Sequence, residues 1–128
     1  MSFKCFLSWV IDCLVFQGEN VSLFGHPIEQ VWVQGVVVVL DEENQELIID
    51  DGTSTIVVAY PSARMLDPPT LGSYVSVQGV VILGEDESGE EIRYIEAKRL
   101  QVLSDFNLES LWPIEIMQAL KYRQAPPT

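Results

Sequence analysis

Two segments of this chain share one pattern, and that pattern restricts the fold more than any other feature of the sequence. The segments are Val31–Leu40 and Tyr74–Leu83, and both contain V-x-V-Q-G-V-V. Both are rich in β-branched residues, which favour strands over helices, and each has a glycine near its centre. A glycine inside a strand marks a bulge or a sharp bend. We therefore predict two long strands, bent at Gly35 and Gly79, that each serve two faces of a small barrel.

Three shorter strands fit between and after the long ones. Glu46–Asp50 and Thr53–Tyr60 are separated by Asp51-Gly52, a dipeptide typical of hairpin turns. The proline-containing stretch Pro61–Pro69 predicts one long connection. Glu91–Leu103 alternates between apolar and polar residues and predicts the fifth strand. This order of elements, followed by a helix, is that of an OB-fold. We expect an all-β chain, a five-stranded OB-fold barrel with a C-terminal helix and an N-terminal extension.

The length of 128 residues predicts one folded unit. We expect its parts to be an N-terminal extension packed on the barrel (1–30), the barrel (31–103), a helix for partner pairing (104–123) and a flexible tail (124–128). Within the extension, Phe3 to Phe16 fits a strand and a helix equally well. The apolar run Cys5 to Phe16 also resembles a signal peptide, but Asp12 interrupts it and it is shorter than the ~20 residues that span a bilayer. We interpret it as folded structure, with targeting as the alternative.

The last segment changes to a helical period. Ser110 fits an N-cap, and Pro113 then falls at the third helical position, where its missing N–H costs nothing. Apolar residues follow at four-residue spacing, namely Trp112, Ile116 and Leu120. We expect about three turns that end near Tyr122. The helix either closes the end of its own barrel or pairs with a helix of another protein, and periodicity does not decide between them.

Charge argues against nucleic-acid binding by this chain alone. The formal net charge is −12 at pH 7, which repels phosphate backbones. In OB-folds the loops that flank the oligonucleotide groove join strands 1 and 2 and strands 4 and 5. Here these loops are Asp41–Glu46 and Gly84–Glu91, which hold nine acids and no base. Strands 2 and 3 offer only Tyr60 as a stacking platform, so the usual site lacks both of its components.

Catalytic and metal chemistry have little support in the sequence. Cys5, Cys13 and His26 stand apart without metal-ligand spacing, so we expect no structural zinc site and two ordinary reduced thiols. No phosphate loop or dinucleotide fingerprint occurs. We expect no enzyme, no catalytic residue and no cofactor. An unrecognised enzyme remains the weakest alternative, and it would need paired carboxylates with perturbed pKa values in a closed pocket.

Several short motifs together resemble one family. They are Val31-Trp-Val-Gln-Gly35, Ile49-Asp-Asp-Gly52, Gly72 to Val81, Glu96-Ala-Lys98, and Leu103-Ser-Asp105 followed by Glu109-Ser-Leu-Trp112. With these residues, which cover about three quarters of the chain, it resembles the RecQ-mediated genome instability protein 2 family, whose members are small OB-fold subunits of the Bloom syndrome helicase complex. The stretch before Val31 shares little with the family beyond a lysine.

The resemblance implies a non-enzymatic nuclear protein with little DNA binding of its own. Its partner would be the C-terminal OB domain of RecQ-mediated genome instability protein 1. The pair would join topoisomerase III alpha and the Bloom helicase to dissolve double Holliday junctions, and it would receive a peptide from the Fanconi anaemia group M protein. The alternative is a small OB subunit of a single-stranded DNA-binding complex, like those of replication protein A or of telomere-capping complexes.

The resemblance also implies partner-binding residues. Trp32, Lys98 and Trp112 fall on family positions linked to complex formation, and Lys4 matches an N-terminal lysine of the family. Ile116 and Leu120 complete the set, because they share the helix face of Trp112. Each residue also has a simpler explanation, since a tryptophan can be core and a lysine can be a surface cation.

Overall fold

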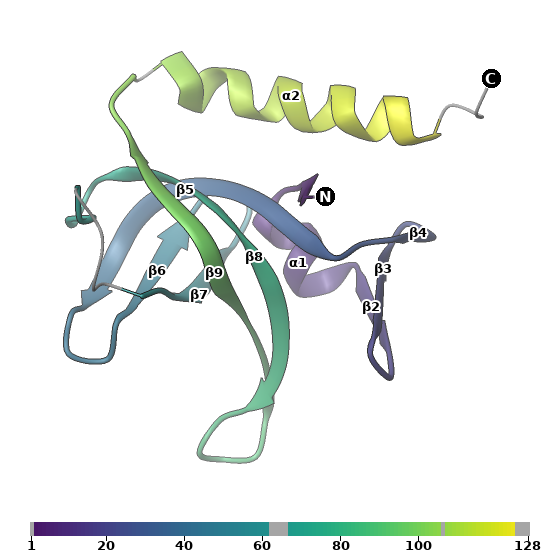
Figure 1. The fold of residues 1–128 in the computed structure, drawn as a ribbon, viewed down its shortest axis with the longest axis horizontal. Coiled ribbons are helices and arrows are strands. Elements are labelled where there is room, and N and C mark those ends of the chain that lie inside the picture. Colours follow the sequence, from purple (N-terminus) through teal and green to yellow (C-terminus); the bar gives the residue numbers. More distant parts are fainter. Residues whose placement is uncertain (1, 62–66, 106, 125–128) are drawn as a thin grey trace.

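The computed structural model describes residues 2–61, 67–105 and 107–124. Its larger sheet has six strands in the order β1-β5-β6-β7-β9-β8, and pairing of β5 with β8 closes it (Figure 1). The strands of this sheet are β1 (Ser2–Lys4), β5 (Gln30–Asp41), β6 (Glu46–Asp50), β7 (Thr55–Ala59), β8 (Tyr74–Glu85) and β9 (Glu91–Leu103). Strands β5 to β9 form the closed five-stranded barrel, so the predicted OB-fold is confirmed.

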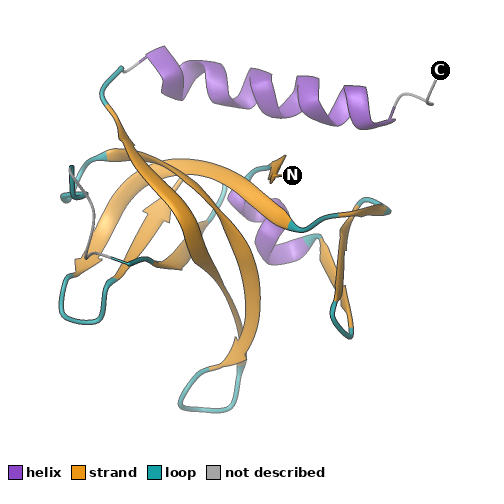
Figure 2. Cartoon of the chain, in the orientation of Figure 1, coloured by secondary structure: helices purple, strands orange, loops and turns teal. Residues whose placement is uncertain are grey.

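Strand β5 serves two faces of the barrel, as the sequence predicted. Its first half pairs with β8, and its second half pairs with β6. Figure 2 shows the same strand curving across both faces. The bulge predicted at Gly35 was wrong in position, because the register shifts between Val37 and Val39 instead. Gly35 is needed for another reason: a Cβ there would lie 2.9 Å from the carbonyl oxygen of Asp50. In β8 the irregularity does fall at Gln78–Gly79, as expected.

The hairpin of β6 and β7 also holds the N-terminal helix α1 (Leu7–Asp12). Asp51 Oδ1 accepts hydrogen bonds within the turn, one of them from the backbone N–H of Thr53 at 2.8 Å. Its Oδ2 accepts a hydrogen bond from the backbone N–H of Leu7 at 2.8 Å, at the first residue of α1. A carboxylate at this position satisfies a helix N–H group that has no partner within the helix. One turn residue therefore fixes both the hairpin and the position of α1.

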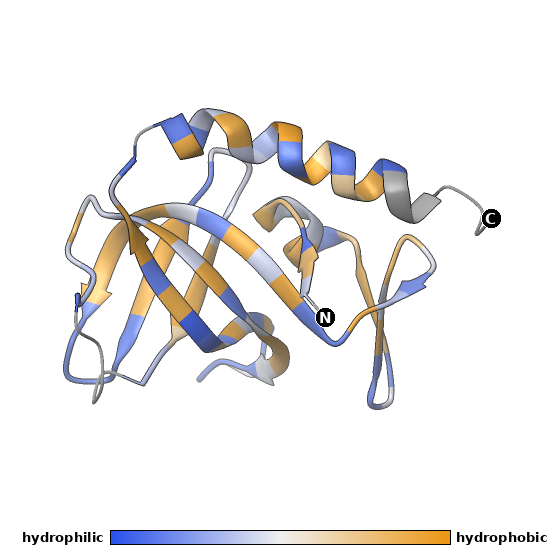
Figure 3. Ribbon diagram, turned by 45° about the horizontal axis from the view of Figure 1, so that its top comes forward, coloured by the Kyte–Doolittle hydropathy of each residue, from blue (hydrophilic) through white to orange (hydrophobic). Residues whose placement is uncertain are grey.

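The N-terminal segment contains both strand and helix, the two structures between which the sequence did not decide. β1 adds to the barrel sheet in parallel with β5. After α1, a small antiparallel sheet is formed by β2 (Leu14–Gln17), β3 (Asn20–Leu23) and β4 (His26–Pro27). Phe3, Leu7 and Leu23 belong to the same buried core as the barrel valines. Figure 3 shows apolar residues alternating with polar ones along the long barrel strands, as expected of strands with one buried face.

The C-terminal helix α2 (Asn107–Gln124) crosses the barrel beside β1 and β5 (Figure 1). It starts earlier than predicted, because Asp105 Oδ1 accepts a hydrogen bond from the backbone N–H of Asn107 at 2.9 Å. Ser110 is therefore not the N-cap, and Pro113 lies inside the helix. There it removes the hydrogen bond that residue 113 would donate to residue 109. The helix extends past Tyr122, and residues 125–128 of the predicted tail lie outside the described residues.

Residues 62–66 of the predicted long connection lie outside the described residues. Among the helices of the described ranges, none has the length and apolar character needed to cross a membrane.

Candidate protein-interaction surfaces

Three of the six predicted site residues meet where α2 packs on the barrel. The rings of Trp32 on β5 and Trp112 on α2 lie 5.6 Å apart between centroids. The ammonium group of Lys4 on β1 lies 4.9 Å from the ring centroid of Trp32 and 5.8 Å from that of Trp112. Lys4 Nζ also lies 3.7 Å from Glu115 Oε1. A cation that faces two aromatic rings is attracted to both. We call Lys4, Trp32, Trp112 and Glu115 the tryptophan cluster.

The two tryptophans of this cluster differ in hydrogen bonding. Trp32 Nε1 donates to Ser76 Oγ at 2.7 Å. Trp112 is 2% exposed, and its Nε1 has no hydrogen-bond partner among the described residues. Nearby, Tyr74 Oη donates to Gln34 Oε1 at 2.8 Å, and burial raises the pKa of the Tyr74 hydroxyl. The polar groups that the barrel strands place beside the cluster are therefore hydrogen-bonded to each other. The indole N–H of Trp112 on α2 is the exception.

The predicted helix face of Trp112, Ile116 and Leu120 is turned toward the chain's own barrel. Ile116 is fully buried, and Leu120 is partly buried against the barrel core. Of the two predicted roles for the helix, this face therefore has the first: it closes one side of its own barrel. Whether these residues also contact a partner stays a prediction.

A second apolar face of α2 was missed by the sequence reasoning. Leu111, Ile114 and Met117 are 48%, 54% and 52% exposed. Ile114 and Met117 line a shallow surface groove together with Pro113, Gln118 and Lys121. Their spacing of three residues is itself a helical signal, but the stronger Trp112 pattern hid it. We call Leu111, Ile114 and Met117 the outer helix face.

Lys98 lies apart from the other predicted site residues. It is on β9, where its Nζ lies 3.0 Å from Glu96 Oε1, and half of its side chain is exposed. It borders a surface hollow next to Tyr60 and the loop that joins β5 and β6. An exposed ion pair of this kind contributes about 0–1 kcal/mol to stability. Loss of this ion pair on binding a partner would therefore cost the fold little. The role of Lys98 in partner binding stays a prediction.

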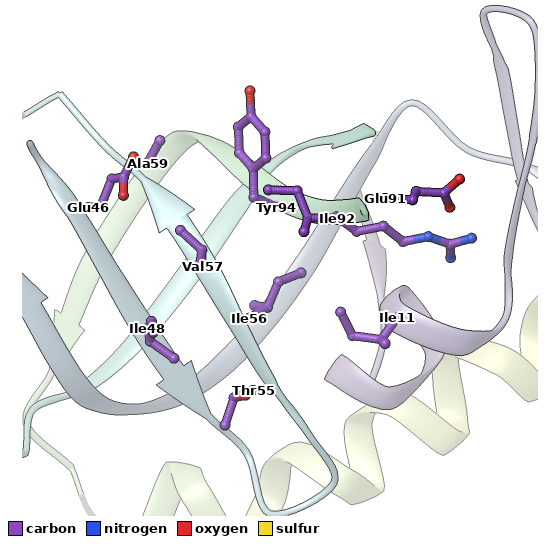
Figure 4. Close-up of a pocket in the computed structure, with 11 residues that line it drawn as sticks. Ile11, Glu46, Ile48, Thr55, Ile56, Val57, Ala59, Glu91, Ile92 and Tyr94 are labelled. Carbon is purple, nitrogen blue, oxygen red and sulfur yellow. The ribbon is translucent and has the colours of Figure 1, made fainter. Parts of the chain in front are cut away.

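The face that binds oligonucleotides in other OB-folds is apolar here. A groove of about 750 Å³ crosses β6, β7 and β9, and Ile48, Val57 and Tyr94 lie along it (Figure 4). Tyr60, the one aromatic residue that the sequence offered on strands 2 and 3, is buried and does not line the groove, so it is no stacking platform there. The aromatic residue that lines the groove is Tyr94 of β9. Acidic residues lie at its edge, including Glu46. The groove has neither a basic track nor a series of stacking platforms.

The remaining candidate groups are separate from one another. His26 is half-buried, and its ring centroid is 6.4 Å from that of Phe3. Cys5 is buried, which raises the pKa of its thiol to about 12, and its thiol and that of Cys13 are free. Within the described ranges, no three His, Cys, Asp or Glu side chains are grouped as a metal site would require.

Comparison with known proteins identifies the family of this chain. The model of the family RecQ-mediated genome instability protein 2 matches residues 12–120. The chain belongs to this family. The match begins well before Val31, which corrects the expectation that the preceding stretch shares little with the family: β2, β3 and β4 lie within it. A search of curated proteins finds no significant match. Membership makes the chain a small OB-fold protein of a genome-maintenance family.

Solved structures share the fold of this family member at low sequence identity. A chain of the S. pombe Stn1–Ten1 complex superposes with a TM-score of 0.74 at 19% identity, covering 96% of this chain and 93% of that one. A chain of a replication protein A heterotrimer bound to single-stranded DNA gives 0.66 at 19% identity, with 84% of each chain covered. A chain of yeast Stn1 and Ten1 gives 0.65 at 15% identity, covering all of this chain and 77% of that one.

Proposed function

We propose that this chain is a non-catalytic scaffold subunit that pairs with the C-terminal OB domain of RecQ-mediated genome instability protein 1. Through that partner it stabilises the nuclear complex of the Bloom helicase and topoisomerase III alpha, which dissolves double Holliday junctions. The pair also binds a peptide of the Fanconi anaemia group M protein. Family membership supports a protein partner in genome maintenance.

The outer helix face is the observation that carries this proposal. α2 buries one apolar face on the barrel and leaves a second apolar face, with Ile114 at its centre, in solvent. Exposed apolar patches on a folded domain mark sites of association. Met and large aliphatic residues at helical spacing are suited to packing against another helix. The tryptophan cluster then holds α2 in the orientation that presents this face.

The test is co-elution of the full chain with that partner domain on a sizing column with light scattering. We expect a one-to-one complex, and we expect the chain alone to self-associate or to be poorly soluble. Ile114→Glu should abolish the complex, because a charge cannot be buried in an apolar helix interface without a partner. Leu83→Glu is the matched control, since Leu83 is 42% exposed on β8, outside α2. Two separate peaks for the unmodified proteins would overturn the proposal.

Lys98→Ala tests the remaining predicted contact. We expect it to weaken the complex and to leave the melting temperature unchanged, because its ion pair with Glu96 is exposed. A fully retained affinity would remove Lys98 from the partner-binding set.

A second candidate function is a small subunit of a single-stranded DNA-binding complex. It is favoured by the shared fold with chains from the Stn1–Ten1 complex and from replication protein A. On this alternative, adding the chain to its partner should raise the affinity for an oligonucleotide. On the scaffold proposal, the affinity changes little, because the groove and its loops are acidic and apolar.

A further inference from the structure

The apolar groove across β6, β7 and β9 has no role in the proposed pairing through α2. Strand register places Ile48, Val57 and Tyr94 side by side on three neighbouring strands. Figure 4 shows these side chains along the groove, with Ile92 beside Tyr94 and Ile11 of α1 at one end. Its volume of about 750 Å³ lies within the range of ligand-binding sites. No residue of α2 lines it, so the groove and the outer helix face are separate surfaces.

Charge around the groove is negative. Glu46 and Glu91 line it, and each is the last residue of one of the two acidic loops. The one cation among the lining residues, Arg93, is already engaged: its Nη1 donates to the backbone oxygen of Val10 at 2.9 Å, and its guanidinium lies 5.0 Å from the ring centroid of Phe16. The charge that faces an occupant is therefore acidic, which attracts a basic partner and repels phosphate groups.

At the end of the groove where Ile11 of α1 lies, one edge of β9 pairs with no strand among the described residues. β7 pairs with β9 only through residues 57–59 and 94–96. Before that point the two strands diverge, and within the described chain Glu91 to Arg93 pair on one side only, with β8. Strand edges of this kind accept extended peptides by backbone hydrogen bonding, and side-chain pockets then give specificity.

We propose that this groove binds an extended protein segment in which basic and aliphatic residues alternate. Alternate side chains of an extended peptide point to opposite sides. Aliphatic residues would then pack on Val57 and its neighbours, and the basic residues would reach the acidic loops at the two ends. Single-stranded nucleic acid is the disfavoured occupant, because aliphatic side chains offer no stacking platform for its bases.

The test uses the full chain and a fluorescent heptapeptide of alternating lysine and valine. Its affinity is measured by fluorescence anisotropy, and the site is mapped by amide chemical-shift changes on the isotope-labelled chain. Val57→Lys, with its fold checked by circular dichroism, should weaken binding about tenfold, because it removes an apolar contact and adds repulsion. Val15→Lys is the matched control, since Val15 is 49% exposed on β2 of the small sheet, outside the groove, and it should change affinity less than about twofold.

A second variant does not perturb the apolar surface. Glu46→Gln combined with Glu91→Gln should weaken binding about threefold or more at low salt, and the difference should shrink as salt screens the charges. Equally tight binding of a lysine–serine peptide would overturn the proposal, because it would show attraction by charge alone. Oligothymidine that shifts the same resonances more strongly, or no peptide-induced shifts in the groove, would also overturn it. Ile114→Glu should retain peptide binding, so failure here is distinguishable from failure of the proposed pairing.

Discussion

Replacement of each tryptophan of the tryptophan cluster by phenylalanine should have unequal effects on stability. Both substitutions remove a similar part of the ring contact between Trp32 and Trp112. The two substitutions differ in whether they leave or remove a buried polar group without a hydrogen-bond partner. Trp32→Phe leaves the Ser76 hydroxyl, 8% exposed, without its indole donor. Trp112→Phe instead deletes an N–H group that has no partner among the described residues.

The magnitude follows from the cost of an unsatisfied buried polar group, about 1–3 kcal/mol. Trp32→Phe creates one unsatisfied group, so its cost adds to the loss of packing. Trp112→Phe removes an unsatisfied group, so the gain offsets part of the loss of packing. We therefore expect Trp112→Phe to be the more stable variant by at least about 2 kcal/mol. For a chain of this size, that difference corresponds to about 6–10 °C in melting temperature.

The assay is thermal unfolding of the full chain followed by far-UV circular dichroism, with Trp112→Ala as a reference. That reference should lose about 3–5 kcal/mol, the usual cost of truncating a buried tryptophan. Amide hydrogen exchange should show α2 opening before the barrel, because Trp112 lies outside the main core cluster. Equal melting temperatures for the two phenylalanine variants would refute the reasoning, since they would show that the Trp112 N–H is satisfied in solution.

Three further predictions concern the barrel and its loops. Gly79→Ala should destabilise by about 3 kcal/mol in urea unfolding, because a Cβ there overlaps the backbone of β9, whereas Gly84→Ala should cost less than about 1 kcal/mol. Cys5 should react with iodoacetamide at pH 8 far more slowly than Cys13, since burial raises its thiol pKa to about 12, and urea should abolish the difference. Hydrogen bonds within its turn, first of all from the Ser88 hydroxyl, hold the pKa of Asp86 below its ordinary 3.8. Their contribution to turn stability is therefore present above pH 3.8 and is lost as the pH falls through the folded pKa. Amide resonances of the turn should report this loss in an NMR titration.

The sequence predicted those parts of the fold where one local pattern decides the structure. The two valine-rich segments became β5 and β8, and the irregularity at Gly79 was foreseen, because β-branched residues and a central glycine act locally. Gly35 was misjudged, since the reason for a glycine there is the approach of the Asp50 backbone, which lies far away in the chain. The start of α1 depends in the same way on a distant group, the carboxylate of Asp51.

The candidate site was predictable only in part, because periodicity identifies a helix face but not what covers it. The spacing of Trp112 and Ile116 placed them together, and only the fold shows that β1 and β5 supply their cover. This affects how partner-binding variants are interpreted. Under the proposed pairing, Trp112→Ala weakens the complex even if Trp112 makes no contact with the partner, because it undocks the helix that presents Ile114. Ile114→Glu should abolish the complex and leave α2 protected from hydrogen exchange. A matching loss of α2 protection in both variants would contradict this division of roles between the two helix faces.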